Sequence, residues 1–261
     1  MRERIPVVVQ GRRARRPAVV RVLWTGAELA VTLGVVLLLL VVHQLWWTNR
    51  QAQEAARDQV DRLERQWAAG PPSPGASPAP GGEAADGAWA AGRSPSPGAP
   101  GHRAAVYPPP RVDLAYAVLR IPRLGLTVPV AEGVGKAAVL NRGYVGHYPH
   151  SAQPGEPGNV ALAGHRNTHG EPFRHLDRLR TGDTVVLDTA RARSTYTVRR
   201  ILPRTTPGDG TVLAAVPYSG VHPSYRFTAP GSYLTLTTCT PAYTSAYRLV
   251  VWGVLRSTQA R

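Results

Sequence analysis

Hydrophobic positions follow two different patterns in this chain, separated by a stretch that has neither. Near the N-terminus, Leu29 to Trp47 is an almost unbroken apolar run. Its 19 residues would extend about 28 Å as a helix, which is close to the thickness of a bilayer's hydrocarbon core. We therefore expect one membrane-spanning helix over residues 24–47.

Short strand-like runs recur from residue 104 to the C-terminus, with turn-forming residues between them. β-Branched and aromatic side chains are frequent in these runs, as is typical of half-buried strands. The expected strands are Tyr116–Ile121, Leu126–Val130, Asn159–Ala163, Thr184–Leu187, Ser194–Ile201, Tyr233–Thr238 and Tyr247–Leu255. Seven or eight strands in a domain of this size predict a mainly β fold, a closed barrel. The candidate short helices are Lys136–Asn141, Pro172–Leu179 and Gly208–Val216.

The stretch between these two patterns divides by composition. Residues 48–67 are highly charged and have no wide apolar face, so we expect a short helical stalk. Residues 68–103 consist mainly of Pro, Gly, Ala and Ser, which predicts a disordered spacer. The expected organisation is a basic segment 1–23, the membrane helix 24–47, the stalk, the spacer and a folded domain 104–261.

Charge around the apolar run predicts the orientation of the chain. Residues 1–23 contain seven arginines and one glutamate, whereas Arg50 alone follows the run closely. By the positive-inside rule the N-terminus is cytoplasmic and the folded domain is outside. A cleaved signal peptide is the alternative. The apolar region of a signal peptide is typically shorter than Leu29–Trp47, and it is followed by small residues and not by a pair such as Trp46-Trp47. An uncleaved signal anchor is therefore favoured.

The formal net charge of +15 does not by itself indicate nucleic acid as the partner. Basic residues of the C-terminal domain are scattered over strands and loops and form no stripe or known binding motif. We therefore expect no nucleic acid partner. Cys239 is the single cysteine, so in an exported domain it has no disulfide partner within its own chain. It is either a reactive thiol or an inert buried residue.

Cys239 ends one expected strand and is followed by Thr240-Pro241, which stops that strand. The next apolar run begins at Tyr247 after a short loop, so the two runs are expected to pair as a hairpin. In such a hairpin Cys239 and Arg248 lie close together on the same rim of the sheet. The sequence thus places a thiol beside a guanidinium.

Among eight histidines, His165 is the candidate partner for this thiol. It is the first polar side chain after the apolar strand Asn159–Ala163 and Gly164. His165 and His169 also have the spacing of a helical zinc motif, but glycines flank them and no glutamate follows His165 as that chemistry requires. We expect no metal.

Thiol, imidazole and guanidinium together suffice for acyl transfer. A free thiol has a pKa of about 8.5 and is mostly protonated at neutral pH, so the nucleophile needs a histidine beside it. The imidazole can protonate a leaving amine and deprotonate an incoming one. A guanidinium stays charged and can stabilise the oxyanion of the intermediate.

The residues around these groups resemble the signature of the sortase family. Thr235-Leu236-Thr237-Thr238-Cys239 is similar to the family's Thr-Leu-x-Thr-Cys strand end, which is followed by an arginine on the next strand. Ala163-Gly164-His165, with Pro172-Phe173 after it, resembles the family's histidine segment. The resemblance extends over Leu114–Leu255, and the anchor and spacer match the family's layout. Within the family the chain is most similar to class E, on residues 146–149, 154–166 and 239–241.

This resemblance implies a sortase-like β-barrel and a membrane-anchored cysteine transpeptidase of a Gram-positive bacterium, with His165, Cys239 and Arg248 as catalytic residues. The enzyme would cleave a Leu-Ala-x-Thr-Gly or Leu-Pro-x-Thr-Gly sorting signal of secreted proteins between Thr and Gly. It would then pass the thioacyl group to an amine of the peptidoglycan precursor, without a cofactor. The implied substrate-binding residues are Tyr148, near which Tyr144 is an alternative, and Thr238.

Other functions compete with this one. An L,D-transpeptidase also uses cysteine and histidine on an extracellular β-domain, but its Ser-x-Gly-Cys string is absent. A pilin-polymerising sortase and an inactive anchored module that binds peptides stay open. The long loop Val216–Pro230 before the cysteine strand is expected to frame the substrate.

Overall fold

Residues 18–69 and 110–261 are described by the computed structural model. Residues 1–17 of the expected basic segment and 70–103 of the expected spacer lie outside them. The first element is α1 (Ala18–Ala68), and the chain divides into two compact units between Trp47 and Thr48. Within the first unit, α1 exposes apolar side chains along its length, and it is the one described helix that is long and apolar enough to cross a membrane.

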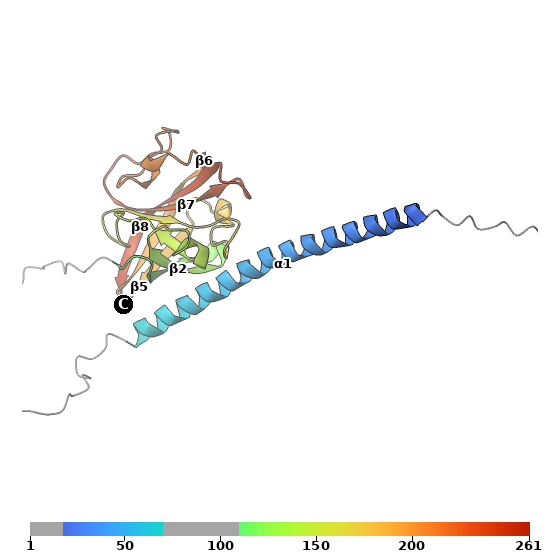
Figure 1. Ribbon diagram of the computed structural model, residues 1–261. Helices are drawn as coiled ribbons and strands as arrows, with labels where there is room; N and C mark the ends of the chain where they lie inside the picture. The colour runs from blue at the N-terminus through green and yellow to red at the C-terminus, as the bar shows by residue number, and fades with distance from the viewer. Residues whose placement is uncertain (1–17, 70–109) are drawn as a thin grey trace, which may run out of the picture. The chain divides into compact units, whose positions relative to one another are not determined.

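Eight strands of the described residues close into a barrel (Figure 1). They are β1 (Ala115–Ile121), β2 (Leu126–Glu132), β3 (Val145–His147), β4 (Gly158–Ala163), β5 (Thr184–Thr189), β6 (Ala192–Thr205), β7 (Ser232–Thr240) and β8 (Tyr247–Ala260). The order around the barrel is β1-β2-β3-β4-β7-β8-β6-β5. The prediction of a closed, mainly β barrel is confirmed. The alternation pattern did not predict β3, because three residues are too few to show a period.

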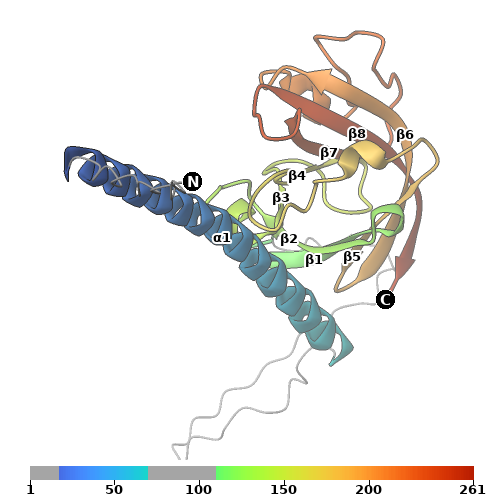
Figure 2. The ribbon, with the colours of Figure 1, turned by 90° about the vertical axis from the view of Figure 1, so that its right-hand side faces the viewer.

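Two of the strand pairings, β2 with β3 and β4 with β7, are parallel, and the others are antiparallel. Figure 2 shows β3, β4, β7 and β8 as successive neighbours. Alternate residues of the strands face the interior, which is why the short alternating runs fold as strands. The barrel interior is filled by fully buried side chains that include Leu119, Val130, Leu162, Leu187, Val198 and Leu236.

Short 3-10 turns replace the three expected helices. They are η2 (Leu140–Arg142), η3 (Leu176–Arg178) and η4 (Gly210–Leu213), and a further turn, η1 (Pro122–Leu124), joins β1 to β2. Each candidate segment is short and bounded by Gly or Pro, so an α-helix cannot nucleate there. A single tighter turn needs fewer residues.

The second half of α1, residues 48–68, packs on the barrel. Ala52, Ala56, Val60 and Leu63 are buried at helical spacing. Ala56 packs with Ala131 of β2, and Val60 and Leu63 pack with Val118 of β1. The cyan end of α1 runs alongside these strands in Figure 2. We expected a stalk with no wide apolar face. The face is indeed narrow, but two alanines allow close approach, so the stripe suffices for docking.

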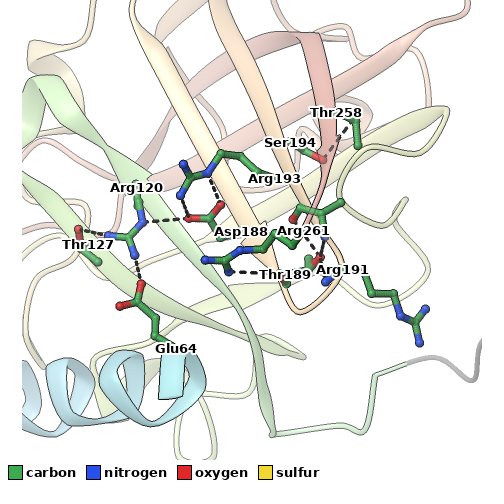
Figure 3. Close-up of polar contacts among 11 residues, drawn as sticks. Glu64, Arg120, Thr127, Asp188, Thr189, Arg191, Arg193, Ser194, Thr258 and Arg261 are labelled. Carbon is green, nitrogen blue, oxygen red and sulfur yellow. Dashed lines mark hydrogen bonds and ion pairs between the residues drawn. The ribbon is translucent and has the colours of Figure 1, made fainter. Parts of the chain in front are cut away.

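A network of ion pairs joins this helix to the barrel (Figure 3). Asp188 is fully buried, and it accepts hydrogen bonds from Arg120 at 3.0 Å and Arg193 at 2.7 Å. Glu64 of α1 pairs with the same Arg120. Burial alone would raise the pKa of Asp188, but the hydrogen bonds and charges of Arg193 and Arg120 outweigh it and lower the pKa below its ordinary value. Asp188 therefore stays ionised.

Candidate active site

The β7–β8 hairpin brings the cysteine and the arginine together. Cys239 and Arg248 are direct partners in the antiparallel register. Side chains of such partners lie on the same face of a sheet, a few ångströms apart. Cys239 is partly exposed, and the Arg248 Nη1 donates hydrogen bonds to the carbonyls of Ser245 at 2.9 Å and Tyr247 at 3.0 Å. These bonds hold the guanidinium at the hairpin rim.

His165 follows β4, the parallel neighbour of β7. Ala163 pairs with Thr237, and the next amide, that of Gly164, donates to the Thr237 carbonyl at 3.2 Å. His165 and Cys239 are each two residues beyond this last registered pair. Parallel strands end at the same edge of a sheet, so the imidazole and the thiol leave the barrel at one rim.

The His165 imidazole is held by a residue that the sequence analysis did not single out. Its Nε2 lies 2.9 Å from the amide oxygen of Asn141. Because an amide oxygen only accepts hydrogen bonds, Nε2 carries the proton and Nδ1 has the lone pair in the neutral ring. The ring also stacks on His169, with 5.3 Å between centroids. Burial foremost, and then the charges of His169 and Lys136, lower the pKa of His165 below its ordinary value of 6.5.

Gly164 allows the histidine segment to approach the core. A Cβ at this position would lie 2.7 Å from the ring of Phe173, which is fully buried. The Gly164 carbonyl accepts a hydrogen bond from the hydroxyl of Thr238 at 2.8 Å. Thr238 is itself buried, and its hydroxyl is used within the fold. Thr238 thus links the cysteine strand to the histidine segment. Its expected role in substrate binding stays a prediction.

Arg166 is a second residue that the sequence analysis did not single out. Its Nη1 donates to the Thr240 hydroxyl at 2.9 Å and, at 3.4 Å, to the carbonyl of Cys239. Its Nη2 lies 3.0 Å from a carboxylate oxygen of Asp177. Arg166 therefore ties the histidine segment to the end of β7 and to η3. No sequence signal marked it beyond its position next to His165.

Comparison with known proteins agrees with this geometry. The sequence profile described as "Sortase domain" matches residues 119–256. The chain belongs to the sortase family. The matched residues include the whole rim described above, from β4 to β8.

Two curated sortases of Streptomyces coelicolor are similar to this sortase over most of its length. Sortase SrtE1 is 40% identical over 248 residues, which cover 92% of this chain and 59% of SrtE1. Sortase SrtE2 is 33% identical over 257 residues, which cover 95% of this chain and 88% of SrtE2. The chain thus matches about three-fifths of the length of SrtE1.

Solved structures of two sortase E chains are similar to the barrel. Sortase E1 from Streptomyces coelicolor, with a tripeptide in its active site, has 46% identity and a TM-score of 0.53, and the match covers 57% of this chain and 92% of that one. Sortase E from Streptomyces avermitilis has 43% identity and a TM-score of 0.50, covering 57% and 93%. The predicted membership of class E is confirmed. Sortases are cysteine transpeptidases, which agrees with a thiol, an imidazole and a guanidinium at one rim.

Tyr148 of this sortase lies at the same end of the barrel. Its hydroxyl is 3.5 Å from that of Thr237, two residues before Cys239 on β7. Tyr148 is half-buried, whereas Tyr144 is 2% exposed and packs with Ala56 in the core. Of the two tyrosines, only Tyr148 has enough exposed side-chain surface to contact a peptide.

The long loop between β6 and β7 is organised around Asp209. Its carboxylate accepts hydrogen bonds from the hydroxyls of Ser219 at 2.5 Å, Thr205 at 2.6 Å and Thr211 at 2.7 Å. Burial alone would raise the pKa of Asp209, but these hydrogen bonds lower it below its ordinary value. Its charge therefore persists and holds the loop in a defined conformation beside the cysteine strand.

The remaining histidines of the sortase domain have other surroundings. His147 is fully buried, with Nδ1 2.7 Å from Glu132 and Nε2 3.0 Å from the carbonyl of Ala152. It is thus a structural residue. Within residues 18–69 and 110–261, no group of three His, Cys, Asp or Glu side chains is arranged to hold a metal ion.

Proposed function

We propose that this sortase cleaves a C-terminal sorting signal of the Leu-Ala-x-Thr-Gly or Leu-Pro-x-Thr-Gly type between Thr and Gly. It then transfers the protein to an amine of the peptidoglycan precursor. The observation that carries the proposal is the register of β7: Cys239 is opposite Arg248 on one side, and His165 follows β4 on the other. Tyr148 beside Thr237 supports a peptide groove that ends at Cys239.

In the proposed reaction His165 takes the proton of the Cys239 thiol, and the sulfur attacks the threonine carbonyl carbon, whose oxygen becomes an oxyanion stabilised by Arg248. The C–N bond to glycine breaks as His165 donates a proton to the departing amine. The thioacyl-enzyme is then attacked by the acceptor amine, from which His165 takes a proton. The carbon–sulfur bond breaks, and a new amide and the free thiol remain.

We further propose that α1 anchors the enzyme in the cell membrane, with its N-terminus cytoplasmic and the barrel extracellular. The arginine excess before the apolar run and the aromatic pair at its end support this topology. It places the thiol where secreted proteins and membrane-linked cell-wall precursors both arrive.

The test is an incubation of the full chain in detergent micelles with a Leu-Ala-x-Thr-Gly peptide and hydroxylamine as the amine. We expect cleavage after Thr, a hydroxamate product, and a peptide adduct on the single cysteine. Cys239→Ala should produce none of these. Binding of the peptide without cleavage or adduct would instead favour the inactive peptide-binding module.

A further inference from the structure

The second half of α1 lies against the loop that follows His165. The Asn49 Oδ1 accepts a hydrogen bond from the backbone N–H of Gly170 at 2.7 Å, and the Gln53 Nε2 donates to the carbonyl of the same residue at 3.2 Å. Both backbone polar groups of Gly170 are thus bonded to side chains of one helix. Gly170 is five residues after His165.

This loop has a strained backbone. His169, Gly170 and Glu171 have φ values of 52°, 82° and 50°, so three consecutive residues are left-handed and two of them carry side chains. Left-handed backbone is unfavourable for a residue that carries a Cβ. Strained segments persist only where their surroundings hold them. Here α1 holds the central residue of the three.

A second loop of the site rests on the same helix. Gly143 is also left-handed, and a Cβ there would lie 2.7 Å from the Ala52 carbonyl oxygen and 3.3 Å from that of His169. Helix and loops therefore pack backbone against backbone. Gly143 is two residues after Asn141, whose amide binds the imidazole. The Asn141 amide and the His169 ring, which contact the His165 ring, belong to loops that α1 supports.

We propose that Asn49 and Gln53 are positioning residues for the sortase reaction, which hold the 169–171 loop and the 141–143 turn so that the His165 imidazole faces the thiol. This inference rests on the proposed function insofar as His165 is its acid–base group. Both side chains act on His165 through Gly170. The working catalytic unit then includes residues 48–68 together with the barrel.

The experiment compares four variants of the full chain in detergent micelles: Asn49→Ala/Gln53→Ala, Asn49→Ala, Asn49→Asp and Gln59→Ala. Asn49→Asp keeps an acceptor oxygen for the Gly170 amide. Gln59 is on the same helix, and its side-chain oxygen accepts hydrogen bonds from Arg62 of that helix, so Gln59→Ala is a matched control. The readouts are kcat and KM on the sorting peptide, and titration of the His165 ring by NMR of labelled histidine, assigned with His165→Gln.

We expect kcat of the double variant to fall tenfold or more, about the cost of a misplaced catalytic group, with KM little changed. Its His165 should titrate closer to the ordinary value, because the ring loses burial. The kcat of Asn49→Ala should fall several-fold, whereas Asn49→Asp and Gln59→Ala should keep the kcat and the His165 titration of the original chain.

Two results would overturn the inference. In the first, the double variant keeps both its kcat and its His165 titration while its melting temperature falls, so that α1 only stabilises the fold. In the second, the kcat of Asn49→Asp falls as far as the kcat of Asn49→Ala. If the double variant does not fold, the two single variants at Asn49 decide alone. The NMR titration needs no turnover, so it tests the positioning even if the sorting peptide is the wrong substrate.

Discussion

The cysteine side and the histidine side of the site are built in different ways. Cys239 and Arg248 belong to one hairpin, so residues close in sequence fix their separation. His165 is held by Asn141, which is 24 residues away, and its segment by Thr238, 74 residues away. The loop that follows is bonded to Asn49, 121 residues away from Gly170. Changes far from the chemistry should therefore affect the imidazole more than the thiol.

The strongest way to break both sides is to remove the reacting groups. Cys239→Ala and His165→Ala should each lower turnover of the sorting peptide by about 10⁴-fold or more, because acyl transfer needs both nucleophile and acid–base group. Initial rates measure the effect, and circular dichroism checks that the barrel stays folded. Turnover within tenfold of the original chain in either variant would show that the site has been assigned wrongly.

Arg248→Lys tests the hairpin side more finely. The ammonium keeps the charge but loses the planar guanidinium, whose Nη1 donates to the Ser245 and Tyr247 carbonyls and whose other N–H groups can face an oxyanion, so we expect a loss of about 10²-fold in kcat. Arg256→Lys, at an exposed position on the same strand, is the control and should be neutral. Equal activity of the two variants would remove Arg248 from the proposed mechanism.

Gly164→Ala tests the histidine side. The new methyl group would meet the buried Phe173 ring, and overpacking of this kind costs about 1–3 kcal/mol. Urea unfolding of the full chain in micelles measures the loss of stability, and peptide turnover should fall with it. Gly208→Ala is the matched control, since nothing lies within 4 Å of its Cβ position. Similar unfolding midpoints for the two variants would contradict the close packing at Gly164.

The pH dependence of stability should show the smallest effect. The pKa of His165 is lowered in the folded state, chiefly by burial, so below pH 6.5 the unfolded chain takes up this proton more readily. Stability should thus fall as the pH drops from above 6.5 through the lowered pKa. His165→Gln should flatten this part of the profile, measured as the unfolding midpoint at each pH. An unchanged slope would mean that the ring is not buried in solution.

Local patterns in the sequence were sufficient for the barrel and for the choice of three chemical groups. Short strand-like runs between turn signals predicted seven of the eight strands, and the stretch around Cys239 predicted a hairpin that the register confirms. The family resemblance, which the profile match bears out, pointed to His165. Its role, like those of Cys239 and Arg248, stays a prediction.

Tertiary structure decided what surrounds the imidazole. Asn141 and Arg166 are ordinary polar residues in the sequence, and only the closure of the barrel brings one to the His165 ring and the other to the end of β7. The packing of residues 48–68 on the barrel could not be predicted from the sequence either, because a narrow apolar stripe with two alanines has low hydrophobicity. Periodicity reports which face of an element is buried, but it contains no information about which distant element will cover that face.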